Sequence, residues 1–479
     1  MSHHIKGRSR SQATLFPEVL DDFVSANNPV RVIDVFVDEL DLNELGFLGV
    51  VPKDTGRPNY HPAMLLKLYL YGYLNHIQST RRLEREANRN IELMWLTERL
   101  APDFKTIADF RKNNSKGIKQ SCRTFIGLCR RLNMFSDAVV AIDGSKFKAS
   151  NNKSNNYTPK NVQTQITRVE KHISRYLAEL DKRDNKEKET DNTPIEEKLT
   201  WLKARLLELR TLKTKVEAHP DKQISTVDPD SRLMKTSGNQ TKVCFNLQSA
   251  VDCKHHLIVA HEVTNTSDRS QLCRMGKQAQ AAVGIDEITV LADKGYFSGQ
   301  DIVDAQDAGL IPLVARTDTS ASDKKGIFNH SLFKYDAKKD VYICPANQDM
   351  RFRTRFTDKK LIYKTYACSV PVCRACSMRD SCTKSAQTRR IRRWEREDRI
   401  ERMVSILEAK PDSMLIRKQT VEHPFGTIKF WMGATHLLTR GFKGVGTEMD
   451  LHVLAYNMKR MISIFGVSGL IKELMTKPF

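Results

Sequence analysis

The sequence predicts a mixed α/β core preceded by an all-helical domain, and two observations carry this prediction. Between residues 62 and 131, apolar side chains recur at the three- and four-residue spacing of helices. From residue 138 the pattern changes to short continuous apolar runs, which are typical of strands buried on both faces. We therefore expect an N-terminal helical domain over residues 1–137 and an α/β domain over residues 138–479.

The elements of the core are expected in the order strand, strand, strand, helix, strand, helix, strand. The apolar runs that mark the strands fall at 138–142, 243–251, 257–263, 288–292 and 311–314. A hairpin turn at 252–256 joins the second strand to the third, and a helix at 270–283 follows. Ser298 is a suitable cap for the second helix, which stops at Gly309.

Two inserts interrupt this core. Residues 161–217 predict a helical hairpin, because both of its halves carry apolar side chains at 3–4 spacing around a charged linker at 181–192. With 13 basic and 11 acidic residues, this hairpin is expected to serve packing or dimer contact rather than DNA. The second insert, about 320–395, is rich in cysteine, and helices are expected after it at 394–409 and 447–464.

Charge indicates a polyanionic partner. The chain has 78 Lys and Arg against 57 Asp and Glu, a net charge of +21. Residues 57–131 carry +9 and residues 351–479 carry +14, whereas residues 138–350 carry only +3. Two basic blocks around an acid-containing middle favour a nucleic-acid enzyme over a merely basic protein. No apolar run approaches the ~20 residues that cross a bilayer, and the N-terminus lacks the core of a signal peptide, so we expect a cytoplasmic protein without membrane contact.

Three carboxylates are candidates for the chemistry. Asp143 and Asp293 are each expected to end a buried strand, where ligand sites of α/β sheets form, and carboxylate oxygens suit hard divalent cations. Glu422 lies in the most basic block, and Lys429 follows seven residues later, on the same face of a helix. The competing interpretation is that the aspartates are strand-end caps and Glu422 a solvated helix residue.

The contexts of these acids resemble those of bacterial insertion-sequence transposases of the DDE class. The resemblance rests on AIDGSK at 141–146, ADKGY at 292–296 and VEHPFGTIK at 421–429. It extends to HPAMLLK at 61–67, DFKTIADFR at 103–111, DPDSRLM at 228–234 and NTSD at 265–268, and so covers nearly the whole chain.

This resemblance implies an RNase H-like core in which Asp143, Asp293 and Glu422 bind two Mg²⁺ (or Mn²⁺) ions. It also implies metal-dependent cleavage and strand transfer of double-stranded DNA at the ends of an insertion sequence, by a homodimer on DNA that acts at the nucleoid. The helical domain would then bind DNA or dimerise.

One departure concerns the helix that carries the glutamate. Relatives often have tyrosine and arginine seven and four residues before it, where this chain has Leu415 and Lys418, with Arg417 adjacent. Lys429, Lys418 and Arg417 are therefore the residues expected to position DNA phosphates.

The cysteine-rich insert predicts a structural zinc site. Cys344, Cys373, Cys376 and Cys382 supply four thiolates, the number that closes a tetrahedral site. Cys368 is a fifth candidate, and a reduced cluster without metal is the alternative. For the whole chain, the alternatives to an active transposase are a catalytically inactive, transposase-derived DNA-binding protein and a different metal nuclease on the same core.

Overall fold

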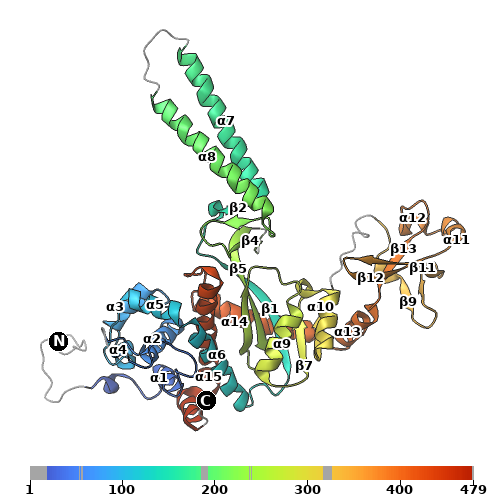
Figure 1. The fold of residues 1–479 in the computed structure, drawn as a ribbon. Helices are drawn as coiled ribbons and strands as arrows, with labels where there is room; N and C mark the ends of the chain where they lie inside the picture. Colours follow the sequence, from blue (N-terminus) through green and yellow to red (C-terminus); the bar gives the residue numbers. More distant parts are fainter. Residues whose placement is uncertain are drawn as a thin grey trace, which may run out of the picture.

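The computed structural model describes residues 19–52, 54, 58–184, 193–236, 238, 240–316 and 326–476. Residues 185–192 of the charged linker and the first residues of the cysteine-rich insert lie outside this described part. Figure 1 shows the N-terminal helices on one side of a central sheet, a long helical hairpin that projects from it, and a small second sheet on the other side.

The N-terminal region is helical, as predicted. Three of its helices begin at capping side chains, since His61, Asn90 and Asp103 each accept a hydrogen bond from a first-turn amide. The helices are α1 (Val30–Asp38), α2 (Pro62–Leu74), α3 (Thr80–Ala87), α4 (Ile91–Leu96), α5 (Phe104–Asn113) and α6 (Ser115–Arg131), after a 3₁₀ turn, η1 (Leu20–Phe23).

The central sheet has the topology expected of an RNase H-like core. Strand β1 (Val139–Lys148) is antiparallel to β5 (Thr241–Asp252), which is antiparallel to β6 (Ile258–Thr264). On its other edge β1 is parallel to β7 (Ile288–Ala292), and β7 is parallel to β8 (Leu310–Val314). Helix α9 (Leu272–Val283) connects β6 to β7, and helix α10 (Gly299–Asp307) connects β7 to β8. Strand β4 (Arg232–Lys235) pairs with β5 on the same edge as β6.

The first strand is longer than its apolar run, which corrects one expectation. Asp143 does not end β1, because the ladder with β5 continues from Val140↔Asp252 to Lys148↔Cys244. The parallel ladder with β7, however, stops at Ile142↔Ala292. Asp143 is thus the first residue beyond the β7 ladder, although it lies inside the strand.

The two ends of the chain share one hydrophobic core. Helix α15 (Gly441–Thr476), which includes a break at Gly466 (φ 70°), packs on α1, α2 and α6 as well as on β6. It is longer than the 447–464 helix expected. Buried side chains run continuously from these helices into the central sheet. The helical region is therefore held to the core by the last helix of the chain.

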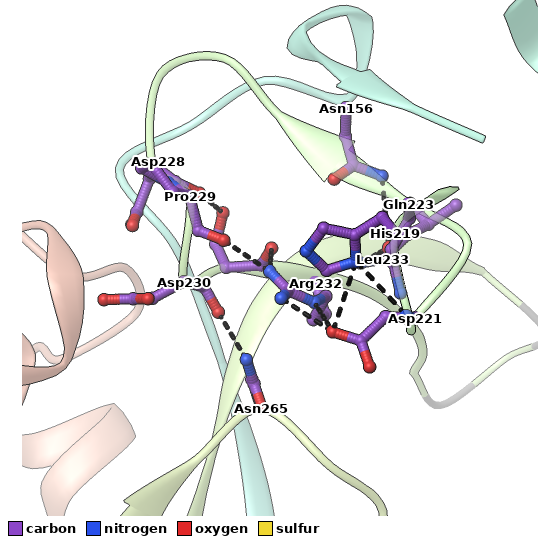
Figure 2. A network of polar contacts seen from close by, with 11 residues as sticks. Asn156, His219, Asp221, Gln223, Asp228, Pro229, Asp230, Arg232, Leu233 and Asn265 are labelled. Carbon is purple, nitrogen blue, oxygen red and sulfur yellow. Dashed lines mark hydrogen bonds and ion pairs between the residues drawn. The ribbon is translucent and has the colours of Figure 1, made fainter. Parts of the chain in front are cut away.

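The predicted hairpin insert is present as α7 (Pro159–Asp184) and α8 (Thr193–Ala218). A separate small core holds its base, where the short strands β2 (Asn156–Tyr157) and β3 (Ile224–Ser225) pair. Figure 2 shows the polar network beneath it: Arg232 donates to Asp221 from Nε (2.9 Å) and from Nη2 (2.7 Å).

The DPDSR segment also anchors α15. Asp228 Oδ1 accepts from the Gly441 amide (3.2 Å) and Asp230 Oδ2 accepts from the Phe442 amide (3.0 Å). The acids at 228 and 230 therefore cap the first turn of α15.

The cysteine-rich insert forms a five-stranded antiparallel sheet in the order β13-β12-β11-β10-β9. Its elements are β9 (Lys334–Asp336), β10 (Val341–Ile343), β11 (Asp349–Asp358), β12 (Leu361–Ala367), α11 (Val370–Arg374), α12 (Arg379–Cys382) and β13 (Arg390–Trp394). The helix expected from Trp394 begins only at Glu397, as α13 (Glu397–Ala409). Residues 390–394 pair with β12 instead, with Ile391, Arg393 and Trp394 buried and Arg390 and Arg392 exposed.

Candidate active site

The candidate site lies where the parallel ladder of β1 and β7 ends. Ile142 and Ala292 form its last pair, so Asp143 and Asp293 follow at equivalent positions at one edge of the sheet. Asp293 also caps a short 3₁₀ turn, η4 (Lys294–Tyr296), through the Gly295 amide (2.8 Å). The strand register thus brings together two aspartates that are 150 positions apart in the sequence.

A guanidinium joins the two acids. Helix α14 (Ser413–Gly426) packs on β1 and β7, and Arg417 Nη2 lies 2.7 Å from Asp143 Oδ1 and 3.9 Å from Asp293 Oδ2. The Arg417 side chain is only 12% exposed. Among the described residues, no aligned hydrogen bond satisfies its buried Nε and Nη2. The contact is therefore chiefly one of charge.

The surroundings of Asp143 oppose its ionisation. Burial raises its pKa to about 6, the Arg417 guanidinium counteracts the rise, and the charges of Asp293 and Asp268 add to it. At this edge of the sheet, the Arg417 guanidinium therefore only partly balances the carboxylates.

Asp268, the last residue of the NTSD motif, belongs to this group. Its Oδ1 accepts from Asn246 Nδ2 (2.8 Å) and from Gln248 Nε2 (2.8 Å), both on β5 and fully buried. Two amides at alternate positions of a strand that is otherwise largely apolar are the signal that sequence reasoning missed, because buried amides need partners.

Lys429 reaches the same edge of the sheet. Its Nζ donates to Ser145 Oγ (2.7 Å) and to the Lys146 carbonyl (3.0 Å) and lies 4.7 Å from the Phe147 ring centroid. Burial lowers the pKa of Lys429, while Cys244 and Asp143 counteract this fall. The lysine expected to hold phosphate is engaged with β1 in this structure.

Glu422 and Lys418 lie apart from the aspartates. Their side chains are about two-thirds exposed and are 4.0 Å apart on α14. Lys429 lies in a π-helical turn, η7 (Thr427–Trp431), which follows α14. Arg417, not Lys418, contacts the acids.

The five cysteines of the insert gather at one end of its sheet. Cys344, Cys368, Cys373, Cys376 and Cys382 all line one small cavity, beside Phe328, Phe333 and Met350. Burial raises the pKa of Cys368 to about 12, and the neighbouring Cys344 adds to the rise. The tertiary structure therefore brings together all four predicted zinc ligands and the fifth candidate.

Within the described ranges, no three carboxylate, thiol or imidazole side chains stand at metal-coordinating geometry, at the aspartates or at the cysteines. The helices of the described residues also include none that is both long and apolar enough to span a membrane.

Comparisons with known proteins show what this chain is similar to. A family model described as a transposase domain (DUF772) matches residues 18–113, over the N-terminal helices, and one described as a transposase DDE domain matches residues 343–462, which include Glu422, Lys429 and the five clustered cysteines. The solved structure of a piggyBac transposase synaptic complex with hairpin DNA is similar over 95% of this chain and 83% of that chain, at 10% identity and a TM-score of 0.31. No curated protein matches. Transposase family models thus match both ends of the chain, and together they support a DDE-type transposase.

Proposed function

We propose that this DNA transposase cleaves and joins DNA strands at the ends of an insertion sequence with Asp143, Asp293 and Glu422 as its metal-binding triad. The observation that carries the proposal is the strand register, which places Asp143 and Asp293 at equivalent positions beneath the helix that bears Glu422. Strand ends in such sheets are where ligand sites form.

The residues present fit a divalent metal. The Arg417 guanidinium lies against both aspartates, where the carboxylates call for positive charge, and the donors are the hard oxygens that Mg²⁺ prefers. Bound Mg²⁺ (or Mn²⁺), as two ions, would polarise the phosphodiester and activate the attacking oxygen.

The other residues of the site act on the DNA. Val421, fully buried, fixes α14 against the core, and the exposed Glu422 carboxylate next to it would complete the triad when the metal is bound. Lys429 and Arg417 supply buried positive charge at the sheet edge, and Lys418 supplies it at the surface. All three would hold phosphates near the acids.

The triad is tested by Asp143→Asn, Asp293→Asn and Glu422→Gln, with Glu408→Gln on α13 as the matched surface control. Purified protein is incubated with Mg²⁺ and duplexes that carry the terminal inverted repeats flanking the gene. We expect wild type and the control to nick these ends and the three variants to lose cleavage while still binding DNA. Cleavage by all three variants would show that the triad is wrong.

The same assay separates the alternatives. A wild-type protein that binds the ends but never cuts them, with Mg²⁺ or Mn²⁺, is the transposase-derived binding protein. Cutting without any preference for the ends indicates a different metal nuclease on this core.

The proposed partner is double-stranded DNA, held by a homodimer at the nucleoid. Sedimentation of the protein with and without end DNA measures the dimer.

We further propose a structural Zn²⁺ ion in the insert, held by Cys344, Cys373, Cys376 and Cys382. The convergence of these thiols on one cavity supports it, because four thiolates close a tetrahedral site and leave no position open for catalysis.

A further inference from the structure

A fourth acid, Asp268, lies beside Asp143 and Asp293, as its contacts with two glycine positions show. A Cβ on Gly144, the residue after Asp143, would overlap Asp268 Oδ1 and Gln248 Nε2. A Cβ on Gly295 would lie 2.9 Å from Asp293 Oδ1 and 3.9 Å from Asp268 Oδ2. The Asp268 carboxylate therefore packs on the backbone beside Asp143 with one oxygen and reaches toward Asp293 with the other.

A buried amide network holds this carboxylate in place. Gln248 Nε2 and Asn246 Nδ2 both donate to Oδ1, and Asn246 Nδ2 also donates to the Thr266 carbonyl (3.0 Å). The Tyr296 hydroxyl donates to Gln248 Oε1 (2.5 Å), which leaves the amide nitrogen of Gln248 for Asp268. Asn246, Gln248 and Tyr296 are fully buried. Three buried polar side chains thus orient one carboxylate whose Oδ2 is given no hydrogen bond among the described residues.

We propose that Asp268 is a positioning residue of the metal site, which accepts hydrogen bonds through Oδ2 from water bound to the divalent cation. This inference rests on the proposed function. The two amides hold Oδ1, so only Oδ2 is left to face the aspartates. A carboxylate fixed in this way suits an outer position, because Mg²⁺ keeps several waters and those waters need fixed acceptors.

The charge balance supports this role. Asp268 places a third carboxylate beside Asp143 and Asp293, the two acids that the Arg417 guanidinium contacts. The two buried amides do not by themselves require a carboxylate, since a neutral amide would accept the same two hydrogen bonds through its oxygen.

The test is Asp268→Asn in the full chain, measured by Mn²⁺ binding in electron paramagnetic resonance, by thermal unfolding without metal, and by the Mg²⁺ concentration that half-saturates end cleavage. Outer-shell substitutions weaken metal binding about 10–100-fold, and we expect a loss in this range. The Tm without metal should stay the same or rise. Asp143→Asn should lose Mn²⁺ binding altogether.

Asp301→Asn is the matched control. Asp301 is another buried aspartate, which accepts from the Leu272 amide (2.9 Å) and the Cys273 amide at the start of α9. It should lose stability and keep its Mn²⁺ affinity. Asp268→Asn with wild-type Mn²⁺ affinity, or with a loss of Tm like that of Asp301→Asn, would overturn the inference. Wild-type Mn²⁺ affinity in Asp143→Asn would instead overturn the proposed function.

Discussion

At the scale of single residues, His452 lies where the helical region packs on the core, and its burial there disfavours a charged imidazole. The imidazole is fully buried on α15, with its ring centroid 4.5 Å from that of Tyr73 on α2. Within the described part of the chain, neither of its ring nitrogens has a hydrogen-bond partner. Burial lowers the pKa of His452 to about 3, and the Arg111 charge adds to the fall.

This depressed pKa predicts acid sensitivity. The folded protein resists a proton that the unfolded chain takes up near pH 6.5, so stability is lost as pH falls from 6.5 toward 3. His452→Phe removes this contribution and keeps an aromatic ring. Between pH 7.5 and 5, wild type should lose about 2 kcal/mol more unfolding free energy than His452→Phe, measured by urea denaturation. His172→Phe, an exposed histidine on α7, is the control. Equal losses in wild type and His452→Phe would contradict the prediction.

At the scale of elements, the sheet β9–β13 has too small a core to be secure alone. Its buried cluster is limited to six side chains, half of them aromatic, and the cysteine cavity adjoins it. Small cores of this kind usually depend on a metal or disulfide staple. This is the physical reason for a closed zinc site at this place.

The zinc proposal predicts about one Zn²⁺ per chain by elemental analysis, in line with a single Cys₄ site. Cys373→Ser and Cys376→Ser should lose the metal and expose residues of β9–β13 to proteolysis, as should chelation of the wild type. Cys273→Ser, on α9 in the core, should keep the zinc. Protein that is purified without chelator and contains no zinc would contradict the proposal.

At the scale of the whole molecule, the basic segments and the charge-balanced hairpin lie in different parts of the structure. The two basic blocks, at 57–131 and 351–479, lie far apart in sequence, and α15 packs against α2 and α6 of the first block. The charge-balanced hairpin instead projects away from the sheet (Figure 1). The basic blocks, and not the hairpin, are the surfaces expected to hold DNA.

DNA binding should accordingly fall steeply with salt. For six or more phosphate contacts the affinity drops about 10³-fold or more between 50 and 200 mM salt, which fluorescence anisotropy on an end duplex measures. Arg390→Ala on β13 should lower the slope of log affinity against log salt by about one. Arg175→Ala on α7 should leave it unchanged. A lower slope for Arg175→Ala alone would assign the hairpin, not the insert, to DNA.

Local pattern was sufficient for much of this fold. The helices of the first region, the strands of the core and the hairpin all occur near their predicted ranges, because each shows its periodicity within its own segment. The predicted element bounds were wrong where pairing with a neighbouring strand decides the secondary structure. Pairing with β5 extends β1 past Asp143, and pairing with β12 turns residues 390–394 into a strand.

By itself, the sequence determined the element order, the transposase resemblance, the distribution of charge and the candidates Asp143, Asp293 and Glu422. Only the tertiary structure decided which side chains meet. It selected Arg417 over Lys418 as the cation on the aspartates, added Asp268 through a buried amide network, and gathered five cysteines at one cavity. The physical reason is that periodicity reports the face of one element, whereas a site depends on strand register, helix packing and turns that bring together residues hundreds of positions apart.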